Sequence, residues 1–139
     1  LKGKMEDRAL RIPDDPTIRA DLRKVQKVTT IAGNVYEYTP GGAWVERMAM
    51  LTARGGTSCG VIGDRIIVAG GEGNPNNASG VFAEVEAYTP ATNSWEALTP
   101  MATPRHGMGA AAWDGRLYVP GGATQEGFGA VDSHEVFTP

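Results

Sequence analysis

The sequence predicts an all-β fold of repeated small sheets, preceded by a short helical segment at the N-terminus. Three observations support this prediction. After residue 33, the apolar runs are too short for helices and end at Gly, Pro or Asn, as is typical of strands recurring about every 8–12 residues. The same short motifs return with a spacing near 50 residues. Charge and glycine content both change abruptly near Gly33, which indicates a boundary there.

The composition is that of a globular chain. Hydrophobic residues make up 41% of the 139 residues, and 13 Lys and Arg stand against 16 Asp and Glu. No run approaches the ~18 apolar residues of a membrane-spanning helix, so no membrane partner is expected. No signal peptide is visible, and the compartment, cytoplasmic or periplasmic, stays open. The single cysteine, Cys59, excludes an intrachain disulfide and is expected to be a buried structural thiol.

Four independent motifs mark the internal repeat. Tyr38-Thr39-Pro40 returns as Tyr88-Thr89-Pro90 and Phe137-Thr138-Pro139, Gly70-Gly71 as Gly121-Gly122, Trp44 as Trp95, and Arg54-Gly55 as Arg105-His106. Each period of the repeat predicts four short antiparallel strands. Because the two tryptophans return with the period, we expect Trp44 and Trp95 to occupy equivalent positions that are at least half buried.

The strands of the last period are the easiest to place. Residues 107–113 are small and apolar, which suits a crowded inner strand, and residues 116–120 alternate in polarity. Asp114-Gly115 between them is a signal for a hairpin turn. Residues 133–137 form the third strand, and the preceding period adds the fourth type at 95–98.

These motifs resemble the kelch repeat, in which a glycine pair is followed by a Tyr and then by a Trp. Gly71, Tyr88 and Trp95 fit this pattern, and Gly122 and Phe137 fit it with Phe in place of Tyr. The resemblance covers residues 34–139. It implies a β-propeller whose blades are four-stranded antiparallel sheets around a central axis. The blades are then a partial one at 34–50, a full one at 53–98 and an incomplete one at 104–139.

This division amounts to about two and a quarter blades, whereas propellers usually have about four to eight. We therefore expect either a fragment of a longer or chimeric chain, whose remaining blades lie elsewhere, or a homo-oligomer in which several copies complete one ring.

Residues 1–33 do not share the repeat, and they carry eight Lys and Arg against five Asp and Glu. Asp15 fits a helix N-cap and Pro16 the first helical position, so a basic helix is predicted at 16–28. Its basic stripe is expected to be a solvated face rather than a nucleic-acid footprint. Residues 6–34 also resemble a segment of the nuclease domain of phage large terminase subunits. The acidic cluster that such a nuclease needs is not recognisable, so the resemblance implies no activity here.

No residue spacing in the chain suggests catalytic metal or cofactor chemistry. The only histidines, His106 and His134, lack zinc-binding spacing, and neither a metal nor a cofactor is expected. Enzymes with the kelch fold act on carbohydrates, so a fragment of a galactose-oxidase-like or sialic-acid-epimerase-like enzyme is the alternative interpretation. A copper oxidase would need two Tyr and two His together, whereas Tyr88 and Tyr118 occupy positions that the repeat itself requires.

The loops after the glycine pairs indicate the leading functional hypothesis, a non-catalytic module for protein–protein interaction. In kelch propellers, such loops and the starts of the inner strands shape one face, where partners usually bind. Residues 72–80 and 123–130 are long, polar and rich in glycine. The candidate contact residues are Glu72, Asn74, Asn76, Asn77, Arg105, His106, Gln125, Glu126 and Phe128.

Overall fold

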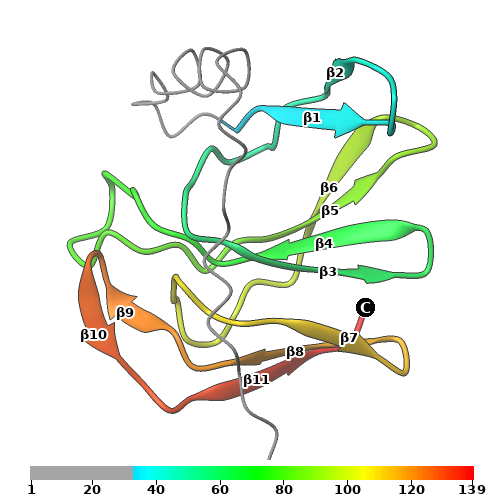
Figure 1. Cartoon of the computed structure of the whole chain (residues 1–139). Coiled ribbons are helices and arrows are strands. Elements are labelled where there is room, and N and C mark those ends of the chain that lie inside the picture. The colour runs from blue at the N-terminus through cyan, green and yellow to red at the C-terminus, as the bar shows by residue number, and fades with distance from the viewer. Residues whose placement is uncertain (1–32) are drawn as a thin grey trace, which may run out of the picture. The chain divides into compact units, whose positions relative to one another are not determined.

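The computed structural model describes residues 33–139, which form eleven β-strands and no helix (Figure 1). The strands are β1 (Val35–Tyr38), β2 (Trp44–Arg47), β3 (Ser58–Ile62), β4 (Arg65–Ala69), β5 (Val85–Thr89), β6 (Ser94–Leu98), β7 (Ala111–Trp113), β8 (Arg116–Pro120), β9 (Ala123–Gln125), β10 (Phe128–Ala130) and β11 (His134–Phe137). The all-β prediction is therefore confirmed for this part of the chain. The helix predicted at 16–28 lies outside the described residues, as does nearly all of the terminase-like stretch.

The strands form four antiparallel sheets. The first sheet is the pair β1-β2, the second is the meander β3-β4-β5-β6, and the third has the order β11-β8-β7. The fourth is the small hairpin β9-β10, which is inserted between β8 and β11. No helix among residues 33–139 is long and apolar enough to cross a membrane.

The hairpin turn between β7 and β8 forms where the sequence predicts it. Asp114 and Gly115 both have positive φ, +48° and +70°. A two-residue hairpin turn of type I′ requires positive φ at both central positions, and Asp-Gly supplies this at low steric cost. The turn therefore sets the register in which Trp113 lies opposite Arg116.

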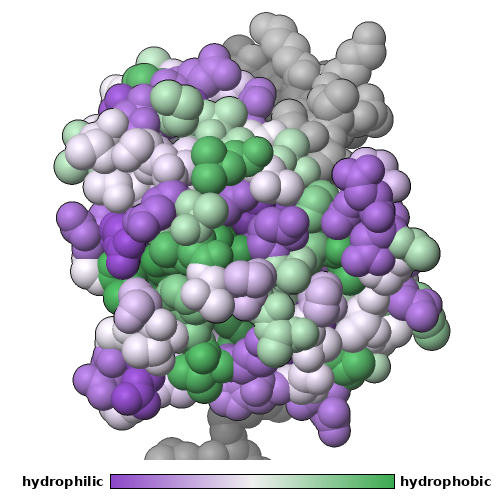
Figure 2. Space-filling model, turned by 180° about the vertical axis from the view of Figure 1, so that it is seen from behind, coloured by the Kyte–Doolittle hydropathy of each residue, from purple (hydrophilic) through white to green (hydrophobic). Residues whose placement is uncertain are grey.

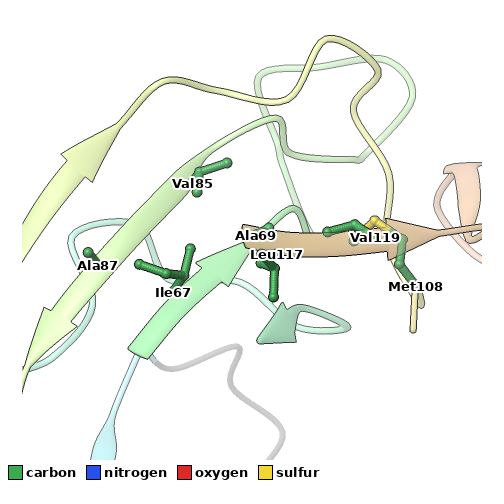
Figure 3. Packing of buried hydrophobic residues seen from close by; sticks show 7 residues of the cluster. All are labelled: Ile67, Ala69, Val85, Ala87, Met108, Leu117 and Val119. Carbon is green, nitrogen blue, oxygen red and sulfur yellow. The ribbon is translucent and has the colours of Figure 1, made fainter. Parts of the chain in front are cut away.

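The hydrophobic core lies between the second and third sheets (Figure 3). Its buried members are Ile67, Ala69, Val85 and Ala87 from the second sheet, with Met108, Leu117 and Val119 from the third sheet and the segment before it. Gly60 in β3 lets the sheets approach, because an added Cβ would lie 2.5 Å from Leu117 Cδ1 and 3.3 Å from Ala112 Cβ. Small residues near the inner strands therefore serve close sheet packing.

Two buried arginines repeat with the sequence period. The Arg54 guanidinium donates to the carbonyls of Thr52 and Gly70, both at 2.7 Å, and to Glu86 Oε1 at 2.8 Å. Each arginine is paired with a glutamate of the third strand of its sheet. Since Arg54, Glu86 and Arg105 are withdrawn from water, their ion pairs and carbonyl contacts must offset a large desolvation cost.

Arg105 makes the matching contacts in the next period. It donates to the carbonyls of Thr103 and Gly121 and to Glu135 Oε1. Glu135 also accepts hydrogen bonds from the backbone N–H groups of Ala102 and Thr103, at 2.9 and 3.1 Å. In both sheets, the buried arginine therefore joins three parts of the repeat. These are the segment before the first strand, the glycine pair after the second strand, and the third strand.

Two burial predictions are wrong. Trp44 is 67% exposed rather than at least half buried, because the first sheet has only two strands within the described residues. Cys59 is exposed rather than buried. It points away from Ser58, whose hydroxyl donates to the Met108 carbonyl, because successive side chains of a strand point to opposite faces.

A hydrophobic patch (green) lies near the middle of the face shown in Figure 2, and hydrophilic side chains (purple) lie around it. Ten large hydrophobic side chains are exposed in the described part of the chain. They are Tyr36, Tyr38, Trp44, Val45, Met48, Leu51, Val61, Trp113, Phe128 and Val136. Most of them belong to the first sheet and the segment that follows it, so apolar surface is concentrated there.

Candidate partner-binding surface

Two segments that leave neighbouring sheets at the same end of the strands lie against each other. The loop 72–80 follows β4, and the β9–β10 hairpin follows β8, both to the left in Figure 1. The Glu126 N–H donates to the Ser79 carbonyl at 2.8 Å. We call the surface built by residues 72–80, His106 and 123–130 the loop end.

Residues 123–130 differ from the sequence expectation. They were predicted as a loop, but β9 and β10 pair as a hairpin, with Gln125 opposite Phe128 and Ala123 opposite Ala130. Gly127, at φ +74°, allows the tight turn between them. Glu126 and Phe128 therefore project from a hydrogen-bonded frame rather than from an irregular loop.

The asparagines of the loop 72–80 help to fold it. Asn74 Nδ2 donates to the Val81 carbonyl at 3.3 Å, and Asn74 Oδ1 accepts the Asn76 N–H at 3.0 Å. Asn77 Oδ1 accepts from both the N–H and the hydroxyl of Ser79, at 3.1 and 3.0 Å. Such side-chain to backbone bonds mimic a backbone turn, so they give the loop a defined shape.

His106 connects the two segments. Its Nδ1 lies 3.2 Å from Glu72 Oε2, and its Nε2 lies 2.8 Å from the Gln125 carbonyl oxygen. Its backbone also pairs with Ala123. The structure therefore brings Glu72, His106 and Gln125 together. The other histidine, His134, belongs to β11, with its ring 6.0 Å from that of Tyr118.

Arg105 is the one predicted contact residue that the structure removes from the surface. It is fully buried, and its guanidinium is occupied by backbone carbonyls and Glu135. A side chain in this environment stabilises the fold and offers no group to a partner. The sequence contains the signal for this role, because Arg105 returns with the same period as Arg54.

An open cleft of about 630 Å³ lies between the loop and the hairpin. It is lined by Asn74, Pro75, Asn77, Ala78, Ser79, Gly80, Gln125 and Glu126. Asn74, Asn77, Gln125 and Glu126 are among the contact residues predicted from the sequence, whereas Pro75, Ala78, Ser79 and Gly80 are not. All four belong to the loop 72–80, whose polar, glycine-rich sequence was the available signal.

Phe128 is the most exposed large hydrophobic side chain of the described residues, at 84%. Directly opposite residues of an antiparallel pair point to the same face, so Phe128 lies on the same side of the hairpin as Gln125, which lines the cleft. The loop end therefore combines a polar cleft, two carboxylates and one exposed aromatic ring. Within residues 33–139 no three His, Cys, Asp or Glu side chains gather as a metal site would require.

Comparison with known proteins identifies the type of repeat. Residues 53–102 match the family profile of the Kelch motif. The sequence is 38% identical over 90 residues to Kelch-like protein terF of Aspergillus terreus, which covers 65% of this chain and 20% of that relative. It is also 38% identical over 85 residues to Kelch-like protein 36 of Rattus norvegicus, covering 60% of this chain and 14% of the relative.

A solved structure supports the same conclusion. The chain resembles the protein described as "Structure of YjhT" with a TM-score of 0.59 and 27% sequence identity, over 68% of this chain and 30% of the other. The chain thus contains kelch repeats, folded as the antiparallel sheets of a β-propeller. It spans about a fifth or less of the length of the Kelch-like relatives described above.

Proposed function

We propose that this chain is part of a non-catalytic kelch propeller that binds a protein partner through the loop end. The main support for the proposal is that polar contacts hold two segments from different sheets together. Glu126 hydrogen-bonds to Ser79, and His106 contacts both Glu72 and Gln125. A surface that is already ordered loses little conformational entropy on binding. The exposed ring of Phe128 supplies the aromatic contact that often dominates binding energy at protein interfaces.

Selection from a random peptide library on the immobilised chain tests this function. We expect enriched peptides whose binding falls at least about five-fold with Phe128→Ala, because a loss above about 1 kcal/mol marks the minority of interface residues that contribute most to binding. Trp113→Ala is the matched control, because Trp113 is 70% exposed but lies beside the β7–β8 turn, at the opposite end of the strands. Enriched peptides that bind the wild type and Phe128→Ala equally would contradict the proposed surface.

We also propose that further blades, from a longer chain or from other copies of this one, complete the propeller. Exposed apolar side chains are concentrated in the first sheet, including Trp44, Val45 and Met48, and another blade would cover such a surface. Propellers usually have about four to eight blades, more than the described sheets supply. Light scattering on the purified 139-residue chain separates the two sources. A defined oligomer supports completion by copies, and a stably folded monomer contradicts it.

A further inference from the structure

The loop end is the docking surface of the proposed function. Its Asp, Glu, Lys and Arg side chains carry only negative charge. The loop end consists of residues 72–80, His106 and 123–130. Its carboxylates are Glu72 and Glu126, and it contains no Lys or Arg. The neighbouring Arg105 is buried and paired with Glu135, so it adds no exposed cation to the loop end. Arg65 and Arg116 begin β4 and β8 and therefore lie at the other end of those strands.

Phe128 adds a second feature that selects for cations. An exposed aromatic face attracts a guanidinium or ammonium group, and Arg also stacks on such rings. Phe128 and Glu126 lie at the tip of one hairpin, and Glu126 lines the cleft beside the loop. A basic side chain could therefore contact the ring and the carboxylate together, while the side-chain amide of Gln125, which also lines the cleft, binds a peptide backbone group.

Resting on the proposed function, we infer that the partner presents a basic segment, rich in arginine, to this cleft. A polyanionic partner is disfavoured because the exposed charges of the loop end are carboxylates. An acidic peptide would meet the same repulsion. A neutral apolar segment would contact Phe128 but would leave Glu126 without a cationic partner.

Three fluorescein-labelled peptides of twelve residues test the inference by fluorescence anisotropy on the full chain. They share length and hydrophobic content and carry four arginines, four serines or four glutamates. We expect the arginine peptide to bind most tightly, with an affinity that falls as salt is raised. Phe128→Ala should weaken the binding of this peptide at least about five-fold, and Glu126→Gln should weaken it about two- to five-fold.

Matched controls lie at the opposite turn of the third sheet. Trp113→Ala removes another exposed aromatic ring, and Asp114→Asn removes an exposed carboxylate, so both should leave the affinity unchanged. Thermal unfolding of each variant verifies that it folds. Equal weakening by the control variants would contradict the inference, because attraction to the net charge alone would explain it.

The inference and the proposed function fail in different ways. If the serine or glutamate peptide binds more tightly than the arginine peptide, and its binding depends on Phe128, the inference of a basic partner is overturned. The proposed binding surface is then still supported. If no peptide of the three, nor any enriched from the random library, depends on Phe128, the binding surface itself is overturned.

Discussion

The first and second sheets contain the same cross-strand aromatic pair in two different environments. Tyr38 lies opposite Trp44 with ring centroids 4.9 Å apart, and Tyr88 lies opposite Trp95 at 5.1 Å. Trp44 is 67% exposed, whereas Trp95 is partly buried and donates its Nε1–H to the Met48 carbonyl at 2.9 Å. The pairing is thus a local property of the repeat, and burial depends on the segment that packs beside it.

A repeated acidic residue shows the same contrast. Glu37, Glu86 and Glu135 follow one another at a spacing of 49 residues. Glu86 is buried against Arg54, whereas Glu37 forms a surface ion pair with Arg47 at 2.6 Å, in which both side chains are exposed to solvent. The same position in the repeat therefore carries a core ion pair in one sheet and a weak surface pair in another.

The largest expected difference between the sheets is in the stability that is lost when each of these two ion pairs is removed. Arg54→Ala should lower the free energy of unfolding by about 3–5 kcal/mol, because it leaves the buried Glu86 carboxylate without its charge partner. Arg47→Ala should cost less than about 1 kcal/mol, because water already solvates both partners. Urea unfolding of both variants provides the comparison, and equal losses would show that the two glutamates do not differ in environment.

Two glycines with nearly the same positive φ test how tightly the second and third sheets pack. Gly70 has φ +62° and Gly63 φ +61°, so alanine meets the same backbone strain at both positions, about 1–2 kcal/mol. An added Cβ at Gly70 would overlap the Arg105 carbonyl and Met108, whereas no atom lies within 4 Å at Gly63. Gly70→Ala should therefore cost about 1–3 kcal/mol more in the free energy of unfolding. Similar melting temperatures for the two variants would contradict this close packing.

The smallest expected effect concerns the indole hydrogen bond that distinguishes the two tryptophans. Trp95→Phe keeps an aromatic ring but removes the bond to the Met48 carbonyl, so it should cost about 0.5–1.5 kcal/mol. Trp44→Phe should stay within about 0.5 kcal/mol of the wild type, as exposed substitutions usually do. Thermal unfolding measures both, and an equal or larger loss at Trp44 would indicate that this residue is covered in solution.

The sequence alone determined the repeat, the all-β class and the kelch resemblance. These features depend on residues close together in the chain. The Asp114-Gly115 turn follows from its own φ preferences, and the strand at Arg116–Pro120 follows from its alternation and its flanking turns. The sequence also indicated where the loop end lies, because Gly-rich polar loops after a strand are visible without a structure, and the binding role of its residues stays a prediction.

Only the tertiary structure decided which side chains these elements bury and bring together. Arg105 looked like a surface residue, and the structure makes it a core residue because backbone carbonyls and Glu135 surround it. Cys59 is exposed because it lies on the opposite face of β3 from Ser58. The meeting of Glu72, His106 and Gln125 joins segments up to about 50 residues apart. Such contacts depend on how the second and third sheets pack against each other. The secondary-structure propensities of single residues do not determine that packing.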